Sequence, residues 1–202
     1  MIIDCHTHTP RPDAIVNIGP DGKPLLPYSY SVGIHPWDAA KATDTDMERV
    51  CSLAESPNVI AIGETGLDAI HRDSLPRQEE LFRRHIDLSE RLHKPLILHV
   101  VRSIDDILAI HKETHPTQAW IIHGFRGKPQ QARQLTKAGL YLSFGERFNP
   151  ESITSTPPEQ RLIETDTSNL TIETIAANTG ISAALAASNI TSVLNRQNVS
   201  TP

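Results

Sequence analysis

The chain has 202 residues, of which 38% are hydrophobic and 21% are charged, and these values are ordinary for a globular protein. This length is sufficient for one domain with a sizeable hydrophobic core. The formal net charge of −5 argues against indiscriminate binding of nucleic acid, which requires a basic surface. No apolar run approaches the roughly 18 residues of a membrane span, so none is expected.

Two features of the sequence bear on the cellular compartment. The only cysteines, Cys5 and Cys51, are too few for a disulfide framework. The N-terminus has no basic segment followed by an apolar one, so a signal peptide is not expected. We therefore expect a reducing, cytoplasmic environment, and nothing in the sequence indicates an obligate protein partner.

Eight short apolar segments, several of them rich in β-branched residues, have the length of buried strands. They cover residues 2–6, 14–18, 29–34, 59–64, 96–100, 119–123, 140–144 and 161–165. Amphipathic patterns that separate or follow the later segments predict helices. These helices cover residues 44–55, 78–93, 103–112, 129–138, 170–178 and 182–194. The alternation of strands and helices predicts a parallel sheet that is covered by helices.

The first two connections do not follow this alternation. Between His8 and Ala14 there is no room for a helix, and residues 19–28 are rich in glycine and proline. Since a parallel crossover usually needs about a dozen residues, the first two crossover helices of a regular barrel are expected to be missing. No linker marks a second domain, so residues 1–195 are expected to form one domain and residues 196–202 a frayed tail.

The first strand carries a pair of histidines, His6 and His8. Because side chains alternate along a strand, His6, His8 and Asp4 are expected on one face, with Cys5 on the other. Two imidazoles directed to one point form half of a metal site. Such a pair is weak evidence when it stands alone.

Residues that commonly bind metals also end four later apolar runs: Glu64, His99, His123 and Asp166. In a β/α barrel the C-terminal ends of the strands carry the catalytic groups. Each of these residues, taken singly, has a plain structural alternative as a polar cap of its strand. Their repeated position at strand ends instead favours one shared metal site.

Six segments together resemble the TatD family of metal-dependent hydrolases, which are relatives of the amidohydrolase barrels. They are IIDCHTH (2–8), SVGIHPW (31–37), VIAIGETGLD (59–68), KPLILHVVR (94–102), WIIHGFRGKP (120–129) and LIETD (162–166). The resemblance implies a distorted (β/α)8 barrel of the TIM type, in the metallo-dependent hydrolase superfamily. It also implies hydrolysis of phosphodiester bonds, often as a 3′ deoxyribonuclease, with one or two divalent ions as cofactor.

The resemblance also implies a role for each metal-binding residue. The ligands of the first ion would be His6, His8 and Asp166, those of the second would be His99 and His123, and Glu64 would bridge the two ions. Asp166 would in addition be the catalytic base that accepts a proton from water. The identity of the metal is left open among zinc, manganese, magnesium and nickel.

Other residues are candidates for contact with substrate. Three could bind a phosphate group: His35, Arg102 and Arg126. Their alternatives are a hydrogen-bonded loop histidine and solvated loop charges. Trp37 is a candidate for stacking on a nucleobase. Asp68 could orient a metal ligand or simply form a turn.

The expected substrates are DNA ends or small phosphate esters. The chain departs from the resemblance in its missing early helices and in residues 167–169, where Thr-Ser-Asn replaces the usual Ser-Pro-Tyr. Two alternatives therefore stay open. One is a small-molecule phosphatase or amidohydrolase on the same barrel, and the other is a metal-binding scaffold with little turnover. The retained Asp166 argues against the scaffold, because a scaffold does not need a catalytic base.

Overall fold

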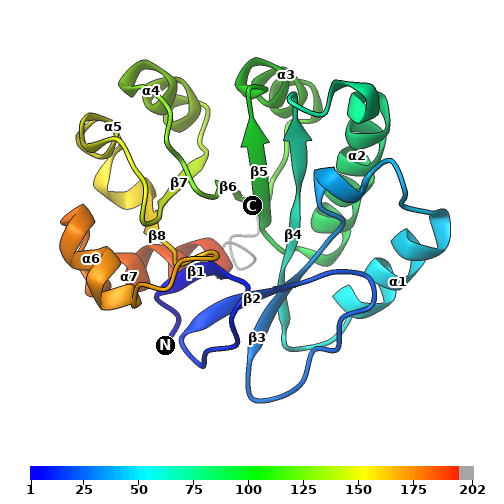
Figure 1. Cartoon of the computed structure of the whole chain (residues 1–202), viewed down its shortest axis with the longest axis horizontal. Helices are drawn as coiled ribbons and strands as arrows, with labels where there is room; N and C mark the ends of the chain where they lie inside the picture. Colours follow the sequence, from blue (N-terminus) through cyan, green and yellow to red (C-terminus); the bar gives the residue numbers. More distant parts are fainter. Residues whose placement is uncertain (196–202) are drawn as a thin grey trace, which may run out of the picture.

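The computed structural model describes residues 1–195, and the expected frayed tail at 196–202 lies outside the described residues. Eight parallel strands close into a barrel in chain order, with the last strand paired to the first (Figure 1). The strands are β1 (Asp4–Thr7), β2 (Ala14–Ile18), β3 (Ser29–Val32), β4 (Val59–Asp68), β5 (Leu96–Val101), β6 (Trp120–Ile122), β7 (Tyr141–Phe144) and β8 (Arg161–Ile163). The expected (β/α)8 barrel is thus confirmed.

Helices surround the strands from β3 onward. They are α1 (Asp44–Ala54), α2 (Leu75–Leu92), α3 (Ile104–Thr114), α4 (Pro129–Lys137), α5 (Pro150–Thr154), α6 (Ile172–Thr179) and α7 (Ala183–Leu194), with 3-10 turns η1 (Pro36–Asp38), η2 (Arg72–Ser74) and η3 (Pro158–Gln160). No helix lies between β1 and β2 or between β2 and β3, which confirms that two crossover helices are missing. The short helix α5 and the 3-10 turns were not expected from the sequence. None of the helices within residues 1–195 is long and apolar enough to cross a membrane.

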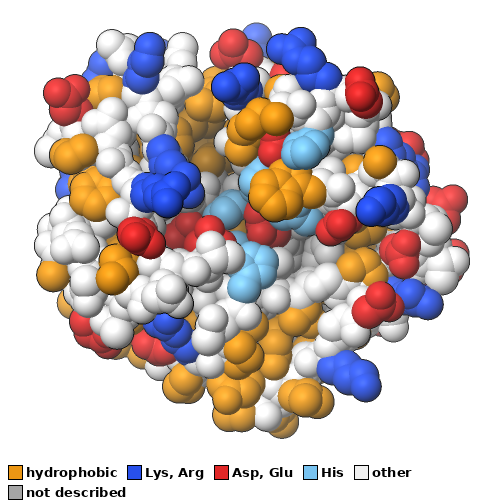
Figure 2. All heavy atoms as spheres, viewed as in Figure 1, with side chains coloured by type: hydrophobic (Ala, Val, Ile, Leu, Met, Phe, Trp, Pro, Cys, Tyr) orange, Lys and Arg blue, Asp and Glu red, His pale blue; other side chains and the backbone are white. Residues whose placement is uncertain are grey.

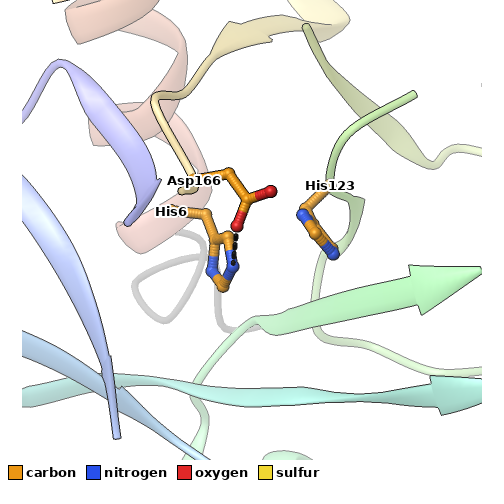
Figure 3. A group of neighbouring side chains, drawn as sticks. All are labelled: His6, His123 and Asp166. Carbon is orange, nitrogen blue, oxygen red and sulfur yellow. Dashed lines mark ion pairs between the residues drawn. The ribbon is translucent and has the colours of Figure 1, made fainter. Parts of the chain in front are cut away.

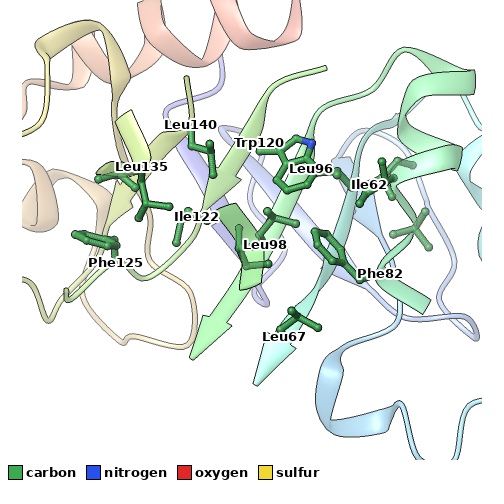
Figure 4. Packing of buried hydrophobic residues seen from close by; sticks show 14 of the residues in the cluster. Ile62, Leu67, Phe82, Leu96, Leu98, Trp120, Ile122, Phe125, Leu135 and Leu140 are labelled. Carbon is green, nitrogen blue, oxygen red and sulfur yellow. The ribbon is translucent and has the colours of Figure 1, made fainter. Parts of the chain in front are cut away.

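Two hydrophobic layers hold the barrel together. Along β5, Leu96 and Leu98 face outward and pack with Phe82 of α2 (Figure 4). Ile97 faces inward and belongs to a separate cluster that fills the barrel. Ile190 of α7 is part of that inner cluster, so α7 closes the end of the barrel that lies opposite the strand C-termini. Because side chains alternate along β5, the next inward-facing residue after Ile97 lies at the open end of the barrel.

Strand β1 corrects one expectation from the sequence. Cys5 lies in the inner cluster, and its Sγ donates to Ser143 Oγ across the barrel at 3.0 Å. Asp4 points the other way, and its Oδ2 accepts a hydrogen bond from Thr165 Oγ1 at 2.6 Å. The pairing of β1 with β2 shifts register between Asp4 and Thr7. Such an irregularity inserts a residue into the alternation, so Cys5 and His6 both face inward and Asp4 does not share their face.

Strand β4 continues past its expected end at Glu64 as far as Asp68. Two glycines allow this extension to run very close to β5. Gly63 and Gly66 have φ values of +132° and +131°, which L side chains rarely adopt. A Cβ at Gly66 would lie 2.3 Å from the carbonyl oxygen of His99. The glycines therefore permit the close approach that brings Glu64 beside the end of β5.

Candidate metal centre

Side chains from five strands converge at the open end of the barrel. The six residues expected at the centre come from β1 (His6 and, just after it, His8), β4 (Glu64), β5 (His99) and the turns after β6 (His123) and β8 (Asp166). Figure 3 shows His6, His123 and Asp166 facing one another from three separate parts of the chain. All six lie at one rim, where the C-terminal ends of barrel strands are expected to gather functional groups.

Glu64 lies at the middle of this group, and its two carboxylate oxygens face different neighbours. Its Oε2 lies 3.3 Å from His6 Nε2 and 3.6 Å from His8 Nε2. The Oδ1 atom of Asp166 approaches the same nitrogens, at 3.8 Å from His6 and 3.5 Å from His8. These four residues form the first half of the centre.

The other oxygen of Glu64 faces three more imidazoles. Its Oε1 lies 2.8 Å from His123 Nε2 and 3.0 Å from His99 Nδ1. His35 also joins this half, because its Nε2 lies 3.0 Å from the same oxygen and 3.2 Å from His99 Nδ1. Sequence reasoning grouped His35 with the substrate contacts, whereas the structure brings it into the cluster itself.

The chemistry of this cluster fits a divalent cation. Both ring nitrogens of His6 are buried and make no hydrogen bond, although a carboxylate oxygen lies only 3.3 Å from one of them. A buried polar atom without a partner is costly, and a metal ion would satisfy it. Three sets of donor atoms lie within 4.8 Å of one another: His6–His8–Glu64, His6–His123–Asp166 and His35–Glu64–His99. Mixed imidazole and carboxylate donors suit zinc, manganese and nickel.

The electrostatics of the cluster also favour a cation. Burial opposes ionisation of Glu64, yet the neighbouring imidazoles, His123 foremost, hold the pKa of this carboxyl well below its ordinary value. Burial likewise disfavours a charged His123, yet the carboxylates of Glu64 and Glu164 raise its pKa well above the ordinary value. The buried carboxylates thus create a field that stabilises positive charge at this position.

Further carboxylates contact two of the imidazoles at the ring nitrogen that does not face Glu64. Asp68 Oδ2 lies 3.2 Å from His99 Nε2, and Asp68 Oδ1 accepts the backbone N–H of Ile70 at 2.9 Å. Asp68 therefore contacts an expected metal ligand and also forms a turn, and its role in orienting that ligand stays a prediction. Glu164 Oε1 lies 3.2 Å from His123 Nδ1. Carboxylates in this position fix the ring orientation of histidine ligands.

Sequence reasoning did not assign a role to Glu164 or to Asn17. A signal for Glu164 was present, because it precedes Asp166 by two residues and so shares its side of an extended segment. Asn17 Oδ1 accepts the backbone N–H of Glu64 at 2.7 Å, which anchors the central carboxylate residue to β2. No local pattern indicates that contact, since the two residues are 47 positions apart.

A cavity of about 1450 Å³ opens beside the cluster, and Arg102, Arg126 and Trp37 are among the residues that line it. Figure 2 shows histidine and acidic side chains gathered at the centre of one face, with lysine and arginine side chains nearby. Within residues 1–195, Arg102 and Arg126 take part in no ion pair, whereas arginines on α2 such as Arg83 pair with acidic side chains. The arginines of the cavity are thus free to bind an anion.

The backbone is strained at two of these positions. Arg102 and Asp166 have φ values of +53° and +49°, in the left-handed region that non-glycine residues rarely occupy. Each lies just beyond a strand end at the rim of the centre. Strained backbone of this kind gathers at functional sites, where the surrounding structure holds it in place.

These observations define a (β/α)8 barrel with a candidate centre for divalent cations at its open end. Residues 26–193 match the family described as TatD related DNase. The chain is 35% identical over 151 residues to an uncharacterised metal-dependent hydrolase of Bacillus subtilis, YabD, across 70% of this chain and 59% of that protein. It is 32% identical over 154 residues to the uncharacterised metal-dependent hydrolase TatD of Mycobacterium tuberculosis, across 70% of this chain and 58% of that protein.

The crystal structure of YjjV, a TatD homologue from Escherichia coli, superimposes with a TM-score of 0.77 and 22% identity, and the match covers 97% of this chain and 96% of that one. The chain belongs to the TatD family. It spans less than two thirds of the length of the curated relatives named above.

Proposed function

We propose that this protein is a metal-dependent hydrolase that cleaves phosphodiester bonds, with DNA ends as its leading substrate class and small phosphate esters as the second. The observation that carries the proposal is the position of Glu64, whose two carboxylate oxygens face two separate groups of potential metal ligands. The family description, TatD related DNase, supports the choice of DNA. Residues 1–195 would act together as one hydrolase domain.

The proposed ligands follow the two halves of the cluster. The first ion would be held by His6, His8 and Asp166, the second by His99 and His123, and Glu64 would be shared between them. His35 adjoins the second half, where its Nε2 is suited to donate to a phosphate oxygen or to ligate the ion. When bound, divalent ions supply Lewis-acid stabilisation of phosphate charge and lower the pKa of a water molecule.

Asp166 is the proposed general base. Its carboxylate is partly exposed, lines the cavity and lies 3.5 Å from His8 Nε2, so it is within reach of both the cluster and a water in the cavity. It would accept the proton of the attacking water as the new bond to phosphorus forms and the bond to the leaving oxygen breaks. Arg102 and Arg126, which have no acidic partner in the described part of the chain, would bind the other phosphate oxygens.

The size of the cavity supports one substrate class over the other. At about 1450 Å³ it is larger than the roughly 300–1,000 Å³ of a typical small-molecule pocket. A small monoester would leave most of that volume to water, whereas the end of a polynucleotide would occupy more of it. This favours DNA ends over small esters.

Three substrates test the proposal in one set of assays. The protein, loaded in turn with Mn²⁺, Mg²⁺ or Zn²⁺, is incubated with a single-stranded oligonucleotide, bis(4-nitrophenyl) phosphate and 4-nitrophenyl phosphate. We expect cleavage of the oligonucleotide and of the diester with at least one of these ions, and none after chelation. Hydrolysis of the monoester alone would instead support a phosphatase. Absence of turnover on all three would leave the amidohydrolase or the scaffold.

A further inference from the structure

Trp37 is exposed to solvent beside the candidate metal centre. The other tryptophan, Trp120, is 1% exposed and packs in the core, whereas 62% of Trp37 is accessible. Among the large hydrophobic residues of the described chain, few are exposed, and Trp37 and Ile70 are the two that adjoin Asp68. Figure 2 shows hydrophobic side chains lying against exposed histidines on this face. Much of the aromatic ring is therefore accessible to a ligand that enters from the solvent.

The indole is held in a fixed orientation despite its exposure. Its Nε1–H donates to Asp68 Oδ2 at 2.7 Å, and its backbone N–H donates to His35 Nδ1 at 3.1 Å. The ring also packs edge-on against the imidazole of His35, with centroids 4.8 Å apart and planes at 74°. A ligand that binds this ring therefore pays little entropy for ordering it.

The same ring lies next to the reacting centre. Asp68 Oδ2, which accepts the indole N–H, also lies 3.2 Å from His99 Nε2. The centroids of the Trp37 and His99 rings are 5.8 Å apart. Trp37 lines the cavity together with His99 and Glu64. A flat group stacked on the indole and a phosphate group at the cluster could thus belong to one ligand, separated by only a few covalent bonds.

We propose that Trp37 is a stacking platform for the nucleobase of the nucleotide whose phosphate is cleaved. The inference rests on the proposed phosphodiesterase function and sharpens it, because it makes nucleoside-bearing diesters the substrate class. Stacking on an aromatic ring tolerates every base, since each base has a π face. The site would therefore recognise a nucleotide end without reading its sequence. A role limited to holding Asp68 needs only the indole N–H and leaves the exposed ring unexplained.

Two diesters with the same leaving group isolate the contribution of the nucleoside. Thymidine 5′-(4-nitrophenyl phosphate) carries a nucleoside, and methyl 4-nitrophenyl phosphate does not. We expect Trp37→Ala to lower the ratio of their kcat/KM values about 5- to 100-fold, as loss of one base–aromatic stack predicts. Trp37→Phe keeps an aromatic ring but loses the N–H, and it should retain most of that ratio. An equal loss on both substrates in Trp37→Ala would assign the residue to positioning and overturn the proposal.

Fluorescence supplies a binding measurement that does not depend on turnover. Trp37→Phe leaves only the buried Trp120, so the difference between wild-type and Trp37→Phe emission reports on Trp37. In stopped-flow mixing with the metal-loaded proteins, thymidine 5′-monophosphate should quench this difference signal and 2-deoxyribose 5-phosphate should not. Equal responses to the two ligands would overturn the platform. Quenching by the nucleotide in a protein that cleaves no diester would retain the platform and refute the proposed function.

Discussion

The carboxylate of Glu164 lies 3.2 Å from Nδ1 of His123 and thereby directs the opposite nitrogen of that ring to Glu64, 2.8 Å away. Glu164 is itself fully buried at the end of β8. Burial disfavours its charged form, but the neighbouring His123 keeps its pKa below the ordinary value, so it stays an anion. Glu164, which received no role from the sequence, thus fixes the orientation of His123, which the sequence predicted to be a metal ligand.

This relationship predicts the effect of removing the Glu164 carboxylate. Glu164→Ala should weaken divalent-metal binding about 10- to 100-fold, because His123 loses the group that holds its ring. Glu164→Gln should weaken it less, since the amide oxygen still accepts the N–H of the imidazole. Competition with a chelating dye measures both affinities. Wild-type affinity in Glu164→Ala, with the fold intact by circular dichroism, would contradict the orienting role.

The central position of Glu64 predicts a change in stoichiometry. Glu64→Ala should lower metal occupancy in both halves of the centre, because each half loses one carboxylate oxygen. Elemental analysis after gel filtration measures the ratio of metal to protein. Glu48→Ala, which removes an exposed acid on α1, is the matched control and should leave the ratio unchanged. Loss of metal from one half only, or from neither, would argue against a shared ligand.

Gly66 is predicted to be irreplaceable for a steric reason. In Gly66→Ala the new Cβ would meet the His99 carbonyl oxygen at 2.3 Å, in addition to the strain of a positive φ. Gly139→Ala is the control, because its φ is +93° and nothing lies within 4 Å of the added Cβ. Backbone strain alone costs about 1–3 kcal/mol. Gly66→Ala should therefore lose more unfolding free energy than its control, as measured by chemical denaturation. If the two variants lost the same unfolding free energy, the close approach of β4 to β5 would not explain the glycine at position 66.

His85 predicts a dependence of stability on pH. It is buried in α2, where its Nε2 accepts the Ile34 N–H at 3.1 Å and its Nδ1–H donates to the Leu81 carbonyl oxygen at 2.7 Å. Burial lowers the pKa of His85 from 6.5 to about 4. The unfolded chain therefore binds a proton here before the folded protein does, and stability is lost as the pH falls from 6.5 toward 4.

The size of that loss follows from the same two pKa values. A shift of this extent corresponds to roughly 3 kcal/mol of unfolding free energy. Urea unfolding with EDTA near pH 7 and about pH 4.5 measures it, with His85→Gln as the variant that lacks the titrating group. The stability advantage of wild type over His85→Gln should shrink by about that amount at the lower pH. An advantage that does not change with pH would refute this account of His85.

The fold was predictable because its signals are local. Each strand appears as a short apolar run, and the absence of a helix after His8 follows from chain length alone. The open-end position of Glu64, His99 and His123 follows from the rule that parallel strands end at one rim. These features therefore depend little on contacts between distant parts of the chain.

The details that sequence reasoning missed depend on contacts between strands. The register shift that turns both Cys5 and His6 inward arises from the pairing of β1 with its neighbours, and no local pattern marks it. The extension of β4 to Asp68 depends on how closely β5 approaches Gly66. His35 enters the cluster through contacts with Glu64 of β4 and His99 of β5, which are distant from it in the sequence. Its position after a strand suggested only a contact with a phosphate oxygen.

The most direct test of the account is a measurement of turnover and metal content together in Asp166→Asn. An amide oxygen can still ligate a cation but cannot serve as a base, so the variant should keep much of its metal and its fold. Its kcat on an oligonucleotide or a generic phosphodiester should fall about 10²- to 10⁴-fold, the usual contribution of general-base catalysis. Near-normal turnover in the metal-loaded variant would contradict the assignment of Asp166 as the base and the mechanism that is built on it.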